Sequence, residues 1–254
     1  GGSYLNAIDP SWIQNMEIYK GPESGDFGSI TGGTMLFKTS SKQEQSLGFT
    51  IGSYKNIKQN LSFKKTIKNH FLQVMQSYQS TDSYREQSAL EKKGFIIKDQ
   101  WNYKRNHQLN TFILFSNTAY ETPGGLTLAQ MMENRRQSRP KTATLPSTKE
   151  QQTGIDQKYT LVGLSHTFPL TSKVTHFALL QGSYMDFKNP FITNFEKRFE
   201  NNWGARTYFN YENNFSNSNL ETRLGFEGQL GKNNIRNYDN NSGSQGNPQN
   251  FDEI

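Results

Sequence analysis

Three arginines in one long polar segment are the residues whose type and spacing most suggest binding chemistry. Arg135, Arg136 and Arg139 lie within residues 117–158, just after a short amphipathic patch at 128–133. Guanidinium groups bind carboxylates through two parallel hydrogen bonds, so the cluster suits an anionic ligand. A connection of about forty residues usually carries function or is disordered. The other interpretation is a short solvated helix whose arginines hold the loop.

The sequence offers no comparable arrangement for catalysis. None of its four histidines, His70, His107, His166 and His176, has a serine or carboxylate beside it in a catalytic motif. His166 and His176 flank one tight turn and could face each other, but a zinc site needs further ligands. The chain has no cysteine, and the acidic pair Asp252-Glu253 lies in a polar tail. We therefore expect no enzyme activity, no metal site and no cofactor.

The composition favours a membrane β-barrel. Of the 254 residues, 32% are hydrophobic and 13% aromatic, and the mean hydropathy is −0.84. A barrel wall explains a low average together with many aromatics, because lipid-facing residues alternate with polar residues that face the lumen. No run approaches the ~18 apolar residues of a membrane helix. The net charge of +6 would suit nucleic acid, but no nucleic-acid motif accompanies it, so we expect no such partner.

Alternation of apolar and polar residues predicts nine strands after residue 46. Each segment is a weak signal alone, but repeated period-two segments of about ten residues are typical of membrane strands. Aromatic residues gather near many of the strand ends, as they do at membrane interfaces. The predicted strands are residues 47–54, 57–67, 71–79, 95–103, 109–117, 159–168, 174–187, 204–213 and 220–230.

The connections between these strands alternate in length. Those near residues 68, 105, 170 and 216 are tight, whereas 80–94, 118–157, 188–202 and 231 onward are long and polar. Up-and-down outer-membrane barrels have this asymmetry, with short periplasmic turns and long extracellular loops. Nine strands cannot close such a barrel, and residues 231–254 look like an interrupted loop. We therefore expect the chain to be a fragment.

Residues 16–38 follow a different pattern, in which a short alternating segment, a glycine-rich loop and an apolar strand succeed one another. The order of residues resembles the end of the plug domain of TonB-dependent outer-membrane receptors. Lys20 replaces the family's usual arginine and lacks its bidentate fork, and Phe27 replaces the usual tyrosine. The matching positions are Met16, Glu17, Lys20, Gly21, Pro22, Phe27, Gly28, Gly32, Gly33 and Lys38. We expect the structural positions of this motif to seat the plug rather than to contact ligand; they are Lys20, Gly21, Pro22, Gly28, Gly32 and Gly33.

The resemblance implies a domain organisation and a function. Residues 1–40 would be the C-terminal part of a plug, 41–46 a linker and 47–254 the first part of an antiparallel transmembrane β-barrel. The family imports ferric siderophores or ferric citrate across the bacterial outer membrane. Ligand binds above the plug, and the TonB complex pulls on the plug through a box that this sequence does not contain.

The long loop adds to the same resemblance. Residues 122–127, Thr-Pro-Gly-Gly-Leu-Thr, followed by an Arg-Pro sequence, resemble the corresponding loop of ferric dicitrate and siderophore receptors. Arg135, Arg136 and Arg139 are thus the predicted ligand contacts. Outer-membrane lipid and lipopolysaccharide would surround the barrel, and contact with lipopolysaccharide is the other role open to the arginines.

Three other functions stay open on the sequence. A SusC-like oligosaccharide importer shares the plug and barrel, but sugar sites favour aromatics and carboxylates where ferric chelate sites favour cations. A passive porin or adhesin barrel would not need the plug-like segment. A soluble β-sandwich enzyme would fold in water without detergent.

Overall fold

The protein folds into one large antiparallel sheet that carries a small N-terminal piece on one face. The computed structural model describes residues 5–21, 32–216 and 218–253. The N-terminal piece consists of two 3-10 turns, η1 (Leu5–Ala7) and η2 (Pro10–Trp12), and a hairpin of β1 (Asn15–Lys20) and β2 (Gly33–Lys38). No helix in this described part of the chain is long and apolar enough to cross a membrane.

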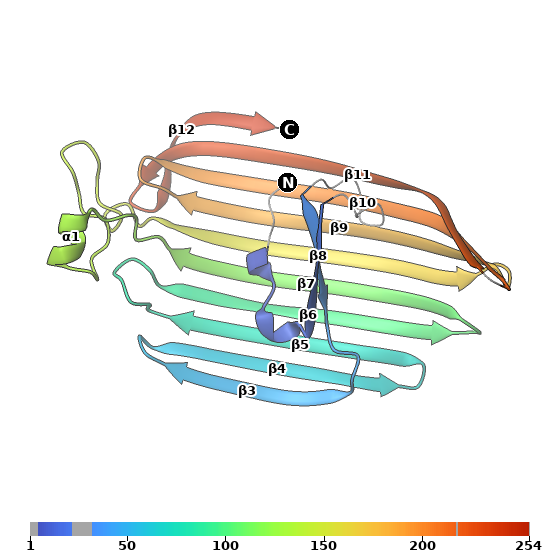
Figure 1. Cartoon of the computed structure of the whole chain (residues 1–254). Helices are drawn as coiled ribbons and strands as arrows, with labels where there is room; N and C mark the ends of the chain where they lie inside the picture. The colour runs from blue at the N-terminus through green and yellow to red at the C-terminus, as the bar shows by residue number, and fades with distance from the viewer. Residues whose placement is uncertain (1–4, 22–31, 217, 254) are drawn as a thin grey trace.

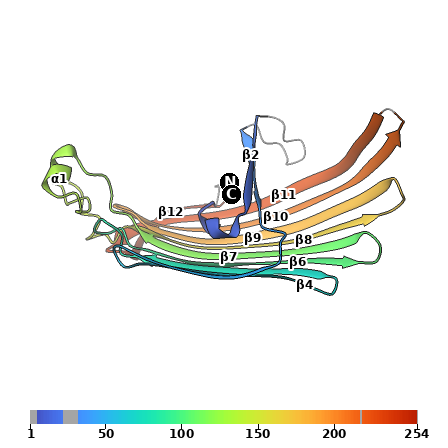
Figure 2. The ribbon, with the colours of Figure 1, turned by 60° about the horizontal axis from the view of Figure 1, so that its bottom comes forward.

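The large sheet has ten strands in sequential order, each antiparallel to the next (Figure 1). The sheet is curved, and the N-terminal piece lies on its concave side (Figure 2). The short helix α1 (Leu128–Glu133) lies between the fifth and sixth strands. The strands are β3 (Glu44–Gly52), β4 (Asn56–Ile67), β5 (His70–Thr81), β6 (Leu90–Tyr103), β7 (His107–Glu121), β8 (Gly154–Pro169), β9 (Val174–Pro190), β10 (Asn194–Phe215), β11 (Ser218–Asn241) and β12 (Ser244–Glu253).

The two faces of the sheet differ in chemistry. Residues that contact the N-terminal piece define the concave face, and their sequence neighbours point to the convex face because successive side chains alternate. Large apolar side chains of the convex face are strongly exposed, such as Phe49 at 64%, Leu180 at 63% and Phe226 at 84%. An apolar outer face and a polar inner face are what lipid and lumen require. The sheet is a portion of an antiparallel transmembrane β-barrel.

All nine predicted strands are present, but the prediction that residues 231–254 form a loop is wrong. β11 continues to Asn241, and β12 follows after a two-residue turn in which Ser242 and Gly243 both have positive φ. Such a turn matches the twist of the flanking strands. Pro248 lies where the register with β11 shifts, a position at which a strand tolerates proline.

The prediction of a long connection at residues 188–202 is also wrong. β9 ends at Pro190 and β10 begins at Asn194, so most of this polar segment is strand. Three of its charged residues, Glu196, Arg198 and Glu200, face the concave side, where Arg198 pairs with the two carboxylates at 2.6 and 3.6 Å. The segment resembles a loop in sequence because lumen-facing positions carry no apolar signal.

The long connections still lie at one end of the sheet, beside α1 (Figure 1). Residues 82–89 and 122–153 are long, as predicted, whereas 53–55, 191–193 and 242–243 at the same end are short. The predicted tight turns after Ile67, Tyr103 and Pro169 are confirmed at the opposite end. β3 includes residues 44–46, so the sheet begins within the segment predicted as a linker.

The two faces predict different tolerance to charge. Leu230 lies on the convex face and is 78% exposed, and Gln229 is its neighbour on the concave face. In the full-length protein in lipid vesicles, we expect Leu230→Arg to lower the free energy of unfolding by about 2–4 kcal/mol, because the guanidinium must enter hydrocarbon. Gln229→Arg is the matched control and should cost much less. Urea titrations of the two variants measure the difference, and equal losses would contradict the assignment of the faces.

Candidate ligand-binding site

Two long connections meet at one end of the sheet and form the candidate ligand-binding site. We call residues 82–89 the short loop and residues 122–153 the long loop. The first turn of α1 in the long loop is closed by a capping box. The Gln130 backbone N–H donates to the Thr127 hydroxyl, and the Thr127 N–H donates to the Gln130 side chain, at 3.3 and 2.9 Å.

Arg85 joins the short loop to the long loop. Its Nε and Nη2 donate to the carbonyl oxygen of Gln137 at 3.1 and 2.9 Å, and its Nη1 donates to that of Gly124 at 2.9 Å. A planar guanidinium with fixed N–H directions suits such a bridge between two carbonyls. Sequence reasoning missed Arg85, because a single arginine gives no signal when its partners are backbone groups of another loop.

Arg136, a predicted ligand contact, is held between two tyrosines. Its Nε donates to the carbonyl oxygen of Tyr84 at 3.2 Å, and its guanidinium lies 5.7 and 5.9 Å from the ring centroids of Tyr54 and Tyr84. Cations over aromatic rings are attracted by the ring quadrupole. The backbone carbonyl of Arg136 also accepts from the Glu86 N–H at 2.7 Å. Arg136 therefore fastens the long loop to the short loop and to the β3–β4 turn.

Arg139, the third arginine of the predicted set, holds the long loop together from within. Its Nη2 donates to the carbonyl oxygen of Pro146, and its backbone N–H donates to that of Pro123 at 2.7 Å. Gly124 passes so close that an added Cβ would lie 2.9 Å from the Arg139 Cβ. Its φ of +70° is also a backbone conformation that glycine adopts more readily than other residues. The buried Thr148 hydroxyl bonds the same carbonyl of Pro123 at 3.3 Å.

The three predicted arginines therefore have different surroundings. Arg136 and Arg139 use their guanidinium groups on the loops, in the manner of the alternative that the sequence left open. Arg135 is exposed and has no side-chain hydrogen bond or ion pair with any described residue. Ligand contact by this set stays a prediction, and Arg135 is the member best placed to make it.

A cavity of about 700 Å³ lies where the two loops join β5, β6, β7 and β8. Its charged lining is mostly acidic, and Lys55 outside the cavity pairs with one of the carboxylates, Asp82, at 2.7 Å. Glu91 and Glu121 alternate with concave-face residues and point to the convex face, and Glu91 pairs with Lys93 at 3.4 Å, so these carboxylates do not face the lumen. The charged residues of the cavity lining are Asp82, Glu91, Glu121, Lys149 and Asp156.

An apolar contact seats the N-terminal piece on the concave face. One buried cluster joins η1 and η2 to three strands and consists of Ala7, Trp12, Met75, Ile96 and Leu114. The Trp12 ring lies over Gly94, where an added Cβ would be 3.1 Å from the Trp12 Cη2 and 2.7 Å from the Phe115 carbonyl oxygen. Gly94 thus leaves the space that the indole occupies.

A buried ion pair accompanies this contact. Asp9 is 2% exposed and accepts from the Ser11 N–H at 2.9 Å, the Ser11 hydroxyl at 2.6 Å and the Lys58 ammonium at 3.2 Å. Burial raises the pKa of Asp9, but the Ser11 hydrogen bonds and the Lys58 charge together outweigh it and hold the pKa below its ordinary value.

Two further lysines of the concave face hold the N-terminal piece rather than offering charge to a ligand. Lys92 donates to the carbonyl oxygen of Ile8 at 3.0 Å, and Lys98 donates to the hydroxyl of Thr39 at 2.9 Å. Sequence reasoning missed both, although residues separated by an even number of positions on one strand share a face.

The motif predicted to seat the plug is only partly described. Lys20 is exposed, Gly21 has φ +80°, and Gly32 has open space around it. Gly33 has φ +122° and approaches the Tyr19 carbonyl oxygen so closely that an added Cβ would lie 2.5 Å from it. Pro22 and Gly28 lie outside the described residues. Gly21 and Gly33 have backbone conformations that favour glycine, and the seating role of the motif stays a prediction.

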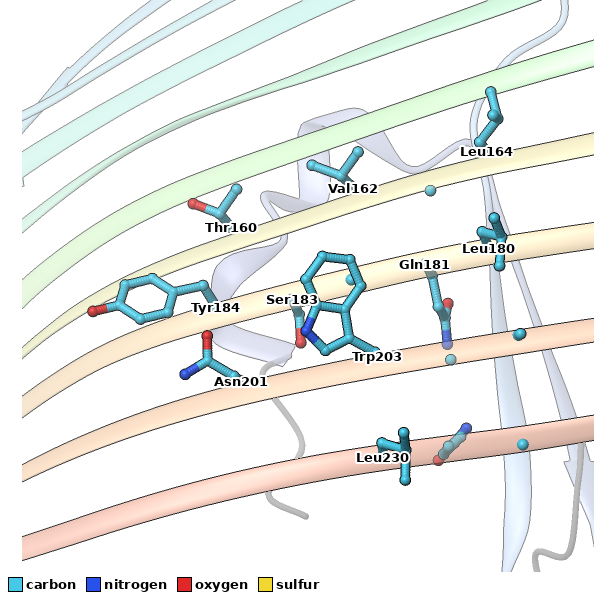
Figure 3. Close-up of a pocket in the computed structure, with 16 residues that line it drawn as sticks. Thr160, Val162, Leu164, Leu180, Gln181, Ser183, Tyr184, Asn201, Trp203 and Leu230 are labelled. Atoms are coloured by element: carbon cyan, nitrogen blue, oxygen red, sulfur yellow. The ribbon is translucent and has the colours of Figure 1, made fainter.

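A further cavity lies on the convex face, away from the loops. It has a volume of about 790 Å³. Figure 3 shows its apolar walls, Val162, Leu164, Leu180 and Leu230, with the indole of Trp203 among them. The indole covers Gly182, where an added Cβ would lie 2.7 Å from the ring. This groove belongs to the lipid-facing surface and not to the ligand site.

The histidines do not converge on a metal site. His166 and His176 both contact the Phe168 ring between them, at centroid distances of 4.8 and 5.1 Å. The His166 Nε2 is hydrogen-bonded to the Tyr103 hydroxyl at 2.6 Å, and the His176 Nε2 to the Thr207 hydroxyl at 2.8 Å. In the described residues, no group of three histidines, cysteines or carboxylates is arranged to hold a metal ion.

Several solved structures with the same fold are receptors or transporters. The ferric citrate transporter FecA, unliganded, superposes with a TM-score of 0.72 at 17% identity over 97% of this chain and 39% of FecA. The pyoverdine receptor FpvA of Pseudomonas aeruginosa, bound to pyoverdine, gives 0.74 at 11% identity, over 97% of this chain and 42% of FpvA. The ferric preacinetobactin receptor BauA of Acinetobacter baumannii gives 0.69 at 13% identity, over 97% and 40%.

These similarities establish the fold and its extent. The chain spans 39 to 42% of the length of these three proteins, and the likeness includes the N-terminal piece because it covers 97% of the chain. No protein-family model and no curated protein sequence matches the chain.

The Arg85 bridge leads to a test of loop order. In the full-length protein, we expect Arg85→Lys to weaken the local stability of the long loop by about 1–3 kcal/mol, because an ammonium cannot serve both carbonyls. Hydrogen exchange of the amides in residues 122–142 should then be faster. Arg135→Lys alters an exposed arginine without partners and is the matched control. If both variants exchange at the wild-type rate, Arg85 does not hold the loop.

The Asp9–Lys58 pair leads to a test by acidification. We call the contact of Asp9 and Trp12 with the concave face the seat of the N-terminal piece. The folded pKa of Asp9 lies below that of an unfolded aspartate, about 3.9. Its stabilising effect is thus complete above that pH and is lost as the pH falls through the folded value. In full-length protein with Trp12 as the only tryptophan, acrylamide quenching of Trp12 should rise below about pH 4.

Asp9→Asn supplies the control for this measurement, because an amide cannot titrate. Its Trp12 should be quenched more than that of the wild type at neutral pH and should change less on acidification. The same steep rise in both proteins would mean that another group controls the seat.

Proposed function

We propose that this chain is part of a TonB-dependent outer-membrane receptor that imports a ferric siderophore or ferric citrate. In this proposal residues 1–40 are the end of the plug, 41–46 the linker and 47–254 the first part of the barrel. The tight turns face the periplasm, and the short and long loops face the outside of a bacterial cell. Iron is the cargo of the protein and not its cofactor.

One observation carries the proposal. The N-terminal piece lies on the concave face of a barrel wall and is fixed there by a buried indole and a buried ion pair. An open pore has no use for such a piece, so the observation favours a gated importer over a passive porin or adhesin. The same combination of wall and N-terminal piece superposes on the ferric citrate and pyoverdine proteins.

Import by such a receptor requires no bond-making chemistry. The ligand would bind between the loops and the plug, and a conformational change of the plug, driven by the TonB complex, would open the path. Ligand binding can shift this equilibrium only as far as its affinity for the two states differs. Arg85, Arg136 and Arg139 would keep the loops in one geometry, and Arg135 would offer its guanidinium to a carboxylate of the chelate.

An oligosaccharide importer of the SusC type is the second candidate. The use of Arg136 and Arg139 on loop carbonyl groups favours it, because fewer cations are then left for an anionic chelate. Sugars offer hydroxyl groups to carboxylates and apolar ring faces to tyrosine. A ferric chelate, in contrast, needs the cations of the long loop.

Binding assays on the full-length protein test the two candidates against each other. We expect ferric citrate or a ferric siderophore to bind and Arg135→Ala to weaken that binding about tenfold, as expected for one lost charge-assisted hydrogen bond. Lys141→Ala removes an exposed cation from the same loop and is the control. Isothermal titration calorimetry with ferric citrate, ferric siderophores and oligosaccharides measures all of these.

Binding of oligosaccharides alone would refute iron import. Equal weakening by Lys141→Ala and Arg135→Ala would mean that the net charge of the loop, and not Arg135, attracts the chelate. Uptake that persists after a protonophore removes the proton gradient would contradict TonB-driven import.

A further inference from the structure

All four histidines of the chain lie in one row of rings on the convex face, next to the tight turns. These are His70, His107, His166 and His176. Aromatic rings fill the spaces between them, and neighbouring centroids along the row are 4.7 to 5.9 Å apart. We call this the ring row; it runs from β5 to β10, and its other members are Trp101, Tyr103, Phe168 and Phe209.

Unpaired cations lie on the three tight turns directly beyond the ring row. They are Lys68 in the β4–β5 turn, Lys104 and Arg105 in the β6–β7 turn, and Lys173 in the β8–β9 turn. All four side chains are exposed, and none has an ion pair or side-chain hydrogen bond with a described residue. We call these residues the cationic rim.

The acidic side chain that faces the ring row on β6 does not neutralise the cationic rim. It is Asp99, which is bonded to the His70 Nδ1 at 2.8 Å and is therefore already engaged. The backbone carbonyl of Arg105 bonds the His107 Nδ1 at 3.0 Å, so the rim and the ring row are held together at this turn. The tight-turn end of the sheet thus carries exposed cations next to a band of rings on the convex face.

We propose that the cationic rim and the ring row together bind anionic phospholipid headgroups. Amphipathic rings prefer the level of the headgroups, and cations beside a membrane attract anionic lipid. The same face continues from the rings onto apolar side chains such as Ile97, Phe95 and Phe115, along which acyl chains can lie. A soluble anion would use the cations but not the rings or the apolar face, so this continuity singles out a lipid.

Native mass spectrometry of the full-length protein in detergent micelles tests the proposal. Dioleoylphosphatidylglycerol should bind more tightly than dioleoylphosphatidylcholine. The triple variant Lys104→Gln, Arg105→Gln, Lys173→Gln should weaken phosphatidylglycerol binding at least tenfold, since each such cation accounts for about a fivefold effect. Its binding of phosphatidylcholine and of ferric citrate should not change, which separates this test from that of iron import.

A second triple variant provides the matched control. Lys141→Gln, Lys158→Gln, Lys188→Gln removes the same charge from the opposite end and should retain phosphatidylglycerol binding. Equal losses in the two variants would mean that only net charge matters and would overturn the proposal, as would unchanged binding in the rim variant. Equally tight binding of glycerol 3-phosphate would show a soluble anion site and would overturn it too. Heat-modifiable migration in gels establishes that each variant is folded.

Discussion

The hydrogen-bond register between neighbouring strands is the constraint on which the rest of this structure depends. A backbone in hydrocarbon must satisfy its N–H and C=O groups within the sheet, so each strand is tied residue by residue to the next. The register runs without a shift from β3 to β11. Because side chains alternate, one fixed register assigns every residue to lipid or lumen. A slip by one residue would turn Met75 and Ile96 away from Trp12 and expose the seat of the N-terminal piece.

The loops solve a different physical problem from the strands. Outside the sheet, the carbonyl groups of the long loop have no neighbouring strand to pair with, and buried ones need donors. Arg85 and Arg139 supply donors to some of these carbonyls, and the buried Thr148 and Thr153 supply donors to others. Arg136 donates instead to the Tyr84 carbonyl oxygen of the short loop. Guanidinium groups are thus used first as structural cross-links. A cationic loop in a receptor of this shape does not by itself measure the charge available to a ligand.

Much of the fold could be predicted from the sequence, and the remainder shows where the signal fails. The alternation of residues 47–230 predicted nine strands because lipid demands apolar side chains at every second position. It failed for residues 194–203 and 231–253, where the concave positions are charged or amide side chains and the pattern resembles a loop. The arginine cluster of the candidate site was visible, but the role of Arg85 was not, because its partners are carbonyl oxygens that no residue type encodes.

The seat of the N-terminal piece sets the energy that any rearrangement must supply. Exposing Trp12 would cost roughly 1.5–3 kcal/mol in lost apolar burial, and the ion pair between Asp9 and Lys58 would be broken. Contacts of Lys92 and Lys98 would be lost at the same time. A bound ligand pays such a cost only through its difference in affinity for the two states. If this piece leaves the wall during import, the lost burial and the broken ion pair are costs that ligand binding or an external source of work, such as the TonB complex, would supply.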